Sequence, residues 1–417
     1  MPLQPLSEGY EGQTHRPLSM TQTPRAAVGW SAAPDAFAAG QAAARTATQQ
    51  LATRHVRCAI VLGSSWLDQA ALLRGVRSIV QGPLIGGSTA GEITPEGPTS
   101  HSCVVLAIAE EAFACSIGAG TELERDPRLA GYQAAQQALR QFKGVQRSGF
   151  LLFGDGLSRG YAEVLRGVQE VMGTSSLVTG GLMGDDLRFV TTYQYAQEQV
   201  FSGGVAGLLV GGACSIGVGL EHGFAPISKP RRVTRARANI LHELDGKPAS
   251  LVYEEYFGDS LMKSVRQGGL TRQLIAYPLG VQLDSTGQFL LRTIMAFGDD
   301  GSLVCTGEVS EETWVQLMIG SKASALEAAT AAARKAVQSL RSVWCALVFN
   351  SVVRKRLLGQ DAAREVENIR QALGSGVPVA GCYTYGEQAP LGAPHTYGRS
   401  SVQTGACLVI AVGPEDR

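Results

Sequence analysis

The sequence predicts an α/β (α+β) protein in which repeated strand–helix–strand units form mixed sheets flanked by helices, with internal duplication. The first observation is a run of small residues, 86–92, that follows an apolar stretch and ends on a carboxylate. The second is its recurrence at 381–387, with a looser copy at 180–186. The third is that strand-length apolar runs alternate with helical periodicity around each copy. Together these observations predict strand–turn units whose turns face a common site.

The elements of the first half follow this plan. An Ala-rich helix is predicted over 34–54, because Pro34 suits a first helical position. Helices are also predicted at 66–80, 126–142 and 161–172, where apolar residues recur every three or four positions. Strands are predicted for the apolar runs at 56–62, 103–109, 113–118, 149–153, 189–195, 199–201 and 205–210.

The second half repeats the order of elements. A helix at 323–340 precedes a strand at 343–349, a helix around 366–373, a strand at 377–380 and a last strand at 407–412. A hairpin is predicted between 288–297 and 302–305. Residues 1–25 are rich in Gln, Thr, Ser, Pro and Gly, which predicts a disordered tail. The predicted domains are therefore 26–224 and 225–417.

Composition bounds the function classes. The chain of 417 residues is 45% hydrophobic and 17% charged, with formal net charge zero, which gives no general attraction to nucleic acid or anionic membranes. The densest basic run, 229–237, lacks interleaved aromatics and is interpreted as a solvated strand edge. The eight cysteines form no CxxC pair and are expected to be reduced and buried. With neither a secretory signal nor an uninterrupted apolar span visible, we expect a cytoplasmic protein without direct membrane insertion.

The repeated segment suggests a binding chemistry. Small residues let the backbone approach a ligand, a hydroxyl follows at Thr89 and Thr384, and a carboxylate follows at Glu92 and Glu387. Backbone N–H groups beside an acid suit an α-amino acid, because they supply donors for its carboxylate and an acceptor for its ammonium. Asp155 and the pair Asp185 and Asp186 could join the same rim. The alternative is that each acid simply hydrogen-bonds its own turn.

Other chemistries are less well supported. The segment lacks the Lys-Ser/Thr of a P-loop, and an enzyme using Glu92 or Asp155 as general base would still need a nucleophile that no motif supplies. The histidines show no paired metal spacing, so no metal site is expected. His222 and His395 lie in Gly/Pro-rich loops and are the candidates for a haem axial ligand.

These motifs resemble those of the FIST family. Residues 86–92, 154–156, 180–186 and 192–193 are similar to the FIST N-terminal domain, and 244–249 and 381–387 to the FIST C-terminal domain. The resemblance implies a sensory, ligand-binding protein of bacterial signal transduction that acts in trans on a histidine kinase or a cyclic-dinucleotide enzyme. Haem-binding nitric-oxide sensors also occur in the family. Met183 departs from the family's usual Ala at that position.

The candidate ligand-binding residues combine the repeated segments with the strand ends, and Arg354 enters as a carboxylate partner. They are Gly87, Ser88, Thr89, Glu92, Asp155, Gly181, Asp185, Asp186, Arg354, Tyr383, Thr384, Tyr385 and Glu387.

Overall fold

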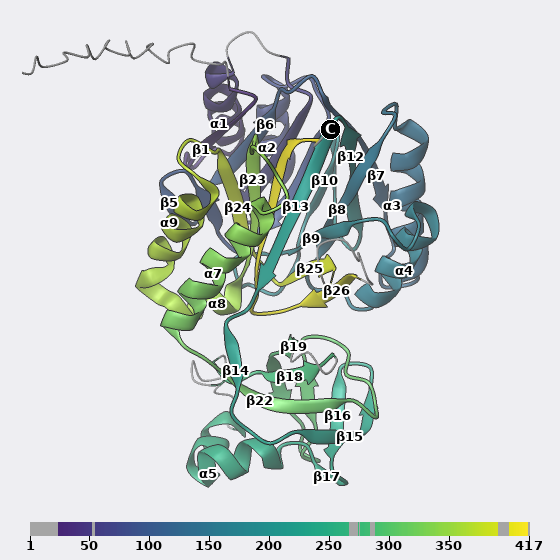
Figure 1. The fold of residues 1–417 in the computed structure, drawn as a ribbon, viewed down its shortest axis with the longest axis vertical. Coiled ribbons are helices and arrows are strands. Elements are labelled where there is room, and N and C mark those ends of the chain that lie inside the picture. Colours follow the sequence, from purple (N-terminus) through teal and green to yellow (C-terminus); the bar gives the residue numbers. More distant parts are fainter. Residues whose placement is uncertain are drawn as a thin grey trace, which may run out of the picture.

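The computed structural model describes residues 24–51, 55–266, 274, 276–283, 288–390 and 400–415. The predicted tail, except for 24 and 25, lies outside these residues, as does His395. Figure 1 shows a larger lobe, called here the core lobe, and a smaller second lobe below it. The mixed α/β class predicted from the sequence is confirmed.

The core lobe consists of three units with the same order of elements. The first unit contains β1 (Ala26–Ser31), α1 (Ala36–Gln50), β2 (Cys58–Ser64), α2 (Gln69–Arg77), β3 (Leu84–Thr89), β4 (Glu92–Thr94), β5 (Gly97–Thr99) and β6 (Cys103–Ile108). The second contains β7 (Phe113–Gly120), α3 (Pro127–Gln141), β8 (Arg147–Asp155), α4 (Tyr161–Met172), β9 (Val178–Met183), β10 (Gln194–Ala196), β11 (Gln199–Phe201) and β12 (Val205–Gly212). The third contains β13 (Cys214–Glu221), α7 (Lys322–Val337), β23 (Cys345–Ser351), α8 (Val352–Leu358), η1 (Gly359–Asp361), α9 (Ala362–Leu373), β24 (Val379–Thr384), β25 (Gly386–Pro390), β26 (Ser400–Gln403) and β27 (Cys407–Pro414).

The units exchange hairpins in a cycle. Each builds one six-stranded sheet, with orders β1-β6-β2-β3-β10-β11, β7-β12-β8-β9-β25-β26 and β13-β27-β23-β24-β4-β5. The last two strands of each sheet come from another unit, so β4–β5 of the first unit completes the sheet of the third. Within each unit a helical connection joins a parallel pair, β2–β3, β8–β9 or β23–β24. Because every sheet needs another unit's strands, the three units fold as one body.

The core of this lobe lies between the inner faces of the three sheets. It includes Ile60, Leu151 and Leu347, which hold corresponding positions on β2, β8 and β23. Separate apolar layers lie between the outer face of each sheet and its helices. Inward and outward side chains alternate along each strand, and both faces are buried, which explains the nearly continuous apolar runs in the sequence.

Side chains at the predicted boundaries explain the helix limits. Asp35 caps α1 and Asp126 caps α3, each accepting a hydrogen bond from a backbone N–H three residues on. The helix predicted from Pro34 therefore starts two residues later, at Ala36. The first glycines of the three segments, predicted to lie in turns, lie instead inside strands: Gly86 and Gly87 in β3, Gly180 and Gly181 in β9, and Gly381 in β24. Gly86 has φ +152°, and a Cβ there would lie 1.8 Å from the carbonyl oxygen of Val61, so glycine allows the close strand pairing.

The second lobe is inserted between β13 and α7. Its elements are β14 (Phe224–Pro226), β15 (Arg231–Arg237), β16 (Ile240–Leu244), β17 (Lys247–Pro248), α5 (Leu251–Arg266), β18 (Leu279–Gln282), β19 (Phe289–Arg292), β20 (Ile294–Phe297), β21 (Leu303–Cys305) and β22 (Trp314–Gly320). They form a nine-stranded sheet with its own apolar core. The predicted hairpin is observed between β20 and β21.

The basic run of the second lobe is not a sheet edge, which corrects the sequence interpretation. β15 lies between β22 and β16 in the sheet order. Three of its arginines form ion pairs with acids on neighbouring elements. The pairs are Arg231 with Glu255, Arg232 with Glu312, and Arg235 with Glu243. Among the described residues, no helix is long and apolar enough to cross a membrane.

Candidate functional site

The three glycine segments meet, and backbone hydrogen bonds join them. The N–H of Gly184 donates to the carbonyl of Ser88, and the Ser88 hydroxyl donates back to the Gly184 carbonyl at 2.6 Å. Ala90 and Tyr383 are joined by an N–H to carbonyl bond of 2.9 Å. The N–H of Tyr385 donates to the carbonyl of Leu182 at 2.9 Å. Sequence segments about a hundred or more residues apart are thus held at one junction between the units.

The repeated glutamates hold equivalent positions at this junction. Glu92 accepts hydrogen bonds from the Thr89 hydroxyl and from the N–H and hydroxyl of Ser102, the residue before β6. Glu387 accepts from Thr384 and from the N–H of Ala406, the residue before β27. Each acid therefore fastens a strand that crosses into another sheet to its own unit. Both carboxyl groups are completely buried.

Burial sets the protonation of these two acids. Desolvation raises the pKa of Glu92 to about 7, although its hydrogen bonds with Ser102 and Thr89 oppose the rise. Desolvation likewise raises the pKa of Glu387 well above its ordinary value. The hydrogen bonds to their own turns match the structural alternative recognised in the sequence. The hydrogen bonds of Glu92 and Glu387 therefore stabilise the fold directly.

In the second unit, whose glycine segment is the looser copy at 180–186, different residues form the corresponding carboxylate contacts. Gln194 on β10 lies opposite Gly87, as Glu92 lies opposite Cys382 and Glu387 opposite Gly181. Asp155 replaces the missing acid, accepting from Thr192 at 2.7 Å and from the N–H of Gly203 at 2.9 Å. Matching the copy at 180–186 to 86–92 puts Asp186 at this position instead, because the segment between β9 and β10 is longer than that between β3 and β4.

Asp185 and Asp186 point to different partners. Asp185 accepts hydrogen bonds from three consecutive backbone N–H groups of the loop that follows it, and from the Tyr385 hydroxyl. Asp186 accepts from the hydroxyls of Ser64 and Ser65 and from the N–H of Ser65, at the end of β2. The strand predicted over 189–195 begins only at Gln194, because this capped loop occupies the preceding residues.

Arg354 is paired internally. Its guanidinium donates to Glu365 at 2.6 and 2.9 Å and to the carbonyl oxygens of His222 and Ala325. Both members of the ion pair are fully buried. Next to it, the Lys355 ammonium lies 4.7 Å from the ring of Tyr383 and donates to the Ala90 carbonyl. Arg354 was predicted to bind a ligand carboxylate, but the carboxylate that it binds here is that of Glu365 in the same chain.

The small residues of the candidate set make room for side chains. A Cβ on Gly87 would lie 2.6 Å from Cγ of Met183, and one on Gly181 would lie 2.6 Å from Phe349. Met183, which departs from the family pattern, is therefore accommodated by Gly87. These glycines serve packing between the units.

His222 is mostly buried, and desolvation lowers its pKa to about 4. Its Nδ1 accepts a hydrogen bond from the N–H of Phe224 at 2.9 Å, which leaves the proton of the neutral ring on Nε2. That tautomer offers no lone pair at Nε2 to a haem iron. Among the described residues, no group of three His, Cys, Asp or Glu side chains could hold a metal ion.

A residue absent from the sequence predictions, Arg292, lies where the two lobes meet. Its guanidinium donates to the carbonyl oxygens of Leu291, Glu308 and Val402, the last at 3.1 Å across the lobes. Arg292 is 8% exposed, and desolvation lowers its pKa. No carboxylate of the described residues forms an ion pair with it. No motif surrounds it in the sequence, so only the packing of the lobes reveals it.

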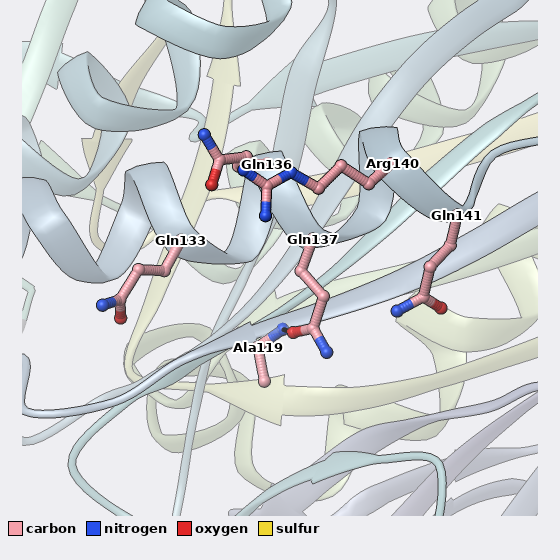
Figure 2. Close-up of a pocket in the computed structure, with 6 residues that line it drawn as sticks. All are labelled: Ala119, Gln133, Gln136, Gln137, Arg140 and Gln141. Carbon is pink, nitrogen blue, oxygen red and sulfur yellow. Dashed lines mark hydrogen bonds between the residues drawn. The ribbon is translucent and has the colours of Figure 1, made fainter.

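Two cavities lie in the described part of the chain away from the predicted residues. One, of about 300 Å³, lies against α3 and β7 and is lined by Ala119, Gln133, Gln136, Gln137, Arg140 and Gln141 (Figure 2). The Gln137 side chain accepts there from the N–H of Ala119. The other, of about 10 Å³, lies between the three sheets and has an entirely apolar lining, so it is a packing gap.

Comparison with known proteins gives the class. The family model of the FIST N domain matches residues 57–247, and that of the FIST C domain matches residues 249–390. A chain that carries both domains is a two-domain FIST protein. The protein therefore belongs to the FIST family, as its motifs predicted.

The similar relatives are themselves uncharacterised. Proteins of Mycobacterium tuberculosis strains CDC 1551 and H37Rv are each 25% identical over 397 residues, covering 88% of this chain and 95% of theirs. A Methanocaldococcus jannaschii protein is 26% identical over 149 residues, covering 34% of this chain and 29% of its own length. A solved cyanuric acid hydrolase from A. caulinodans shares 12% identity with a TM-score of 0.32, over 94% of this chain and all of its own. That score is too low to support an inference.

Proposed function

We propose that this protein is a small-ligand-binding sensor of bacterial signal transduction. It binds an amino acid or a similar small polar metabolite and acts in trans on a signalling protein, such as a histidine kinase or a cyclic-dinucleotide enzyme. Membership of the FIST family supports the sensory role, since FIST domains are as a class sensory and ligand-binding. The proposal treats the protein as a binding protein, and turnover of a bound compound would contradict it.

The observation that carries the proposal is the buried guanidinium of Arg292. A buried cation is costly unless an anion compensates it, and the described residues supply only carbonyl oxygens. A ligand carboxylate would provide the missing charge and could engage the guanidinium through two hydrogen bonds. Arginine is suited to this role because its planar fork matches a carboxylate.

Side chains that could accept hydrogen bonds from a ligand ammonium lie near Arg292, on β26 and on its neighbour β25. Gln403, next to Val402, is buried, and its side-chain oxygen accepts no hydrogen bond from the described residues. Gln403 lies opposite Glu387 in the β25–β26 pair. An unsatisfied buried acceptor costs about 1–3 kcal/mol, which a ligand donor would recover. An ammonium would also favour the ionised form of Glu387, whose pKa burial raises.

The position of Arg292 suggests how binding would be transmitted. The lobes meet there through the Arg292–Val402 bond and through hydroxyl contacts of Thr404 with Thr293 and Thr306. A ligand that contacts both lobes binds one arrangement of them better than another. It would therefore shift the population toward that arrangement, and a partner could recognise the result.

A thermal-shift screen of amino acids and small carboxylic acids tests the proposal, with calorimetry for any compound that stabilises the protein. A true ligand at a hundred times its Kd should stabilise by about 2.7 kcal/mol. Each active amino acid is compared with its amide and its des-amino analogue. We expect Arg292→Gln to abolish the response to the carboxylate and Gln403→Met to weaken the preference for the ammonium.

Two controls sharpen the result. Arg235→Gln removes an exposed arginine of the same lobe and should leave binding unchanged. Arg292→Lys keeps the charge without the fork and should bind more weakly than the parent protein. Binding that survives in Arg292→Gln would exclude this site, and the absence of any stabilising compound would count against the sensor proposal.

A further inference from the structure

Aromatic and apolar side chains gather on the surface beside the junction of the units. Trp66 is 60% exposed, Phe189 is 52% exposed and Val190 is 66% exposed. Together with His101 and Arg188 they form what is called here the aromatic–arginine surface. Large side chains in such a contiguous exposed group are typical of interaction sites.

The loop that carries three of these residues is held by a buried carboxylate. Asp185, 1% exposed, accepts from the backbone N–H groups of Phe189 at 2.9 Å, Val190 at 2.6 Å and Thr191 at 3.0 Å. The Tyr385 hydroxyl donates to Asp185 and accepts from the N–H of Leu187 at 3.0 Å. The loop therefore presents its side chains from a fixed backbone.

The backbone of this loop is strained. Asp186, Leu187 and Phe189 have φ of +55°, +63° and +54°, a region that bulky L residues rarely adopt. Such conformations persist only where surrounding contacts impose them, and they are concentrated at functional sites. On this loop Phe189 is exposed, and its ring stacks on that of Tyr385 at 5.1 Å between centroids.

The surface also carries an uncompensated positive charge. The guanidinium carbon of Arg188 lies 4.8 Å from the centre of the Trp66 ring, and the His101 ring packs edge-on against Trp66 at 5.6 Å. Within the described part of the chain Arg188 forms no ion pair, and the neighbouring Asp186 is engaged by Ser64 and Ser65. Trp and Arg are the residues most enriched at the energetic centres of interfaces.

We propose that the aromatic–arginine surface docks an acidic segment of a partner protein. A partner carboxylate would bind the Arg188 guanidinium, and an apolar partner side chain would pack against Trp66, Phe189 and Val190. Asp185 and Tyr385 are then positioning residues, since they fix the loop without contacting the partner. The inference goes beyond ligand binding, and it stands whether or not Arg292 binds a ligand.

Selection from a displayed library of random short peptides tests the proposal. The full chain is the bait, and the Arg188→Glu chain is used to remove peptides that bind elsewhere. We expect enriched peptides to combine Asp or Glu with an aliphatic or aromatic residue.

In fluorescence polarisation with the best peptide, Arg188→Glu and Phe189→Ser should each lose at least about tenfold in affinity. Added salt should weaken binding to the parent chain.

Controls separate docking from folding. Arg140→Glu reverses an exposed arginine on α3 and should keep full peptide affinity (Figure 2). Asp185→Asn keeps Arg188 and Phe189 but weakens the hydrogen bonds that hold their loop. It should therefore also weaken peptide binding. Enrichment of basic or purely polar peptides, or equal binding by Arg188→Glu, would overturn the proposal. So would sedimentation showing a dimer that Arg188→Glu dissociates, because the surface would then bind a second copy.

Discussion

Glu92 and Glu387 hold the same structural position in two different sheets. Each follows a threonine by three residues, accepts its hydroxyl, and binds the N–H of the residue before the last strand of its unit. The two acids lie on β4 and β25, which are strands contributed to another unit's sheet. The shared motif is thus the device that fastens an exchanged hairpin to its own unit.

The raised pKa of Glu92 predicts a pH-dependent stability. Its pKa is 4.5 as a free side chain and about 7 in the folded protein. Its contribution is therefore fully present below about pH 4.5 and is lost as the pH rises toward 7, because the unfolded chain ionises first. The gap corresponds to about 3 kcal/mol. Glu92→Gln, which mimics the protonated form, should remove the part of this dependence that Glu92 contributes in urea unfolding between pH 4.5 and 7.5, and the part due to Glu387 should remain.

Glu96→Gln is the matched control, because Glu96 is exposed on the same hairpin. It should keep the pH dependence of the parent chain. Asp186 and Lys355 also lie near Glu92, with opposite effects on its charge. A slope as steep in Glu92→Gln as in the parent chain would assign the titration to Glu387 instead.

The elements could be predicted from the sequence wherever the pattern was local. The helix at 161–172 and the strands near 103–109 and 407–412 follow from periodicity and apolar runs, and all are observed. The glycine segments were found but interpreted as turns, because glycine usually marks turns. Here Gly86 and Gly180 allow two strands to pair closely, which requires knowledge of the neighbouring strand.

The candidate site could be predicted only in part, for the same physical reason. Motif repetition found Glu92 and Glu387 but misplaced the third copy, since Gln194 is separated from β9 by an insertion. It could not find Arg292, whose significance depends on burial and on the carbonyl of Val402 in another lobe. Charge compensation over such distances leaves no local pattern in a single sequence.

Gly86→Ala should unfold or strongly destabilise the core lobe. A Cβ at this position would lie 1.8 Å from the Val61 carbonyl oxygen, inside the β2–β3 pair, and neither strand can move away. The expected loss is roughly 3–5 kcal/mol in the free energy of unfolding. Gly374→Ala is the control, because Gly374 also has a positive φ, +103°, but a Cβ there would meet no non-neighbouring atom of the described residues within 4 Å. A similar loss in both variants would show that the backbone angle, and not the clash, sets the cost.

The buried pair of Arg354 and Glu365 should be strongly coupled. Arg354→Met leaves Glu365 buried without its cation, which costs about 3–5 kcal/mol. Arg354→Met combined with Glu365→Leu should cost clearly less than the sum of the single changes. A double-mutant cycle from urea unfolding measures the difference. The same cycle on the exposed pair Arg166 and Glu163 should give at most about 1 kcal/mol. Additive effects at Arg354 and Glu365 would contradict the pairing.

Thiol labelling should single out Cys115. It is the half-buried member of the eight cysteines, and the other seven are buried. Burial raises the pKa of Cys345 to about 12 and that of Cys214 to about 11, so their thiolates are scarce at neutral pH. Iodoacetamide on the native protein, followed by peptide mass spectrometry, should modify Cys115 first and the others at the rate of global unfolding. In Cys115→Ser the fast phase should vanish while unfolding stability is retained. Fast labelling of Cys214 or Cys345 instead would mean that the apolar core between the three sheets opens at its edge without global unfolding.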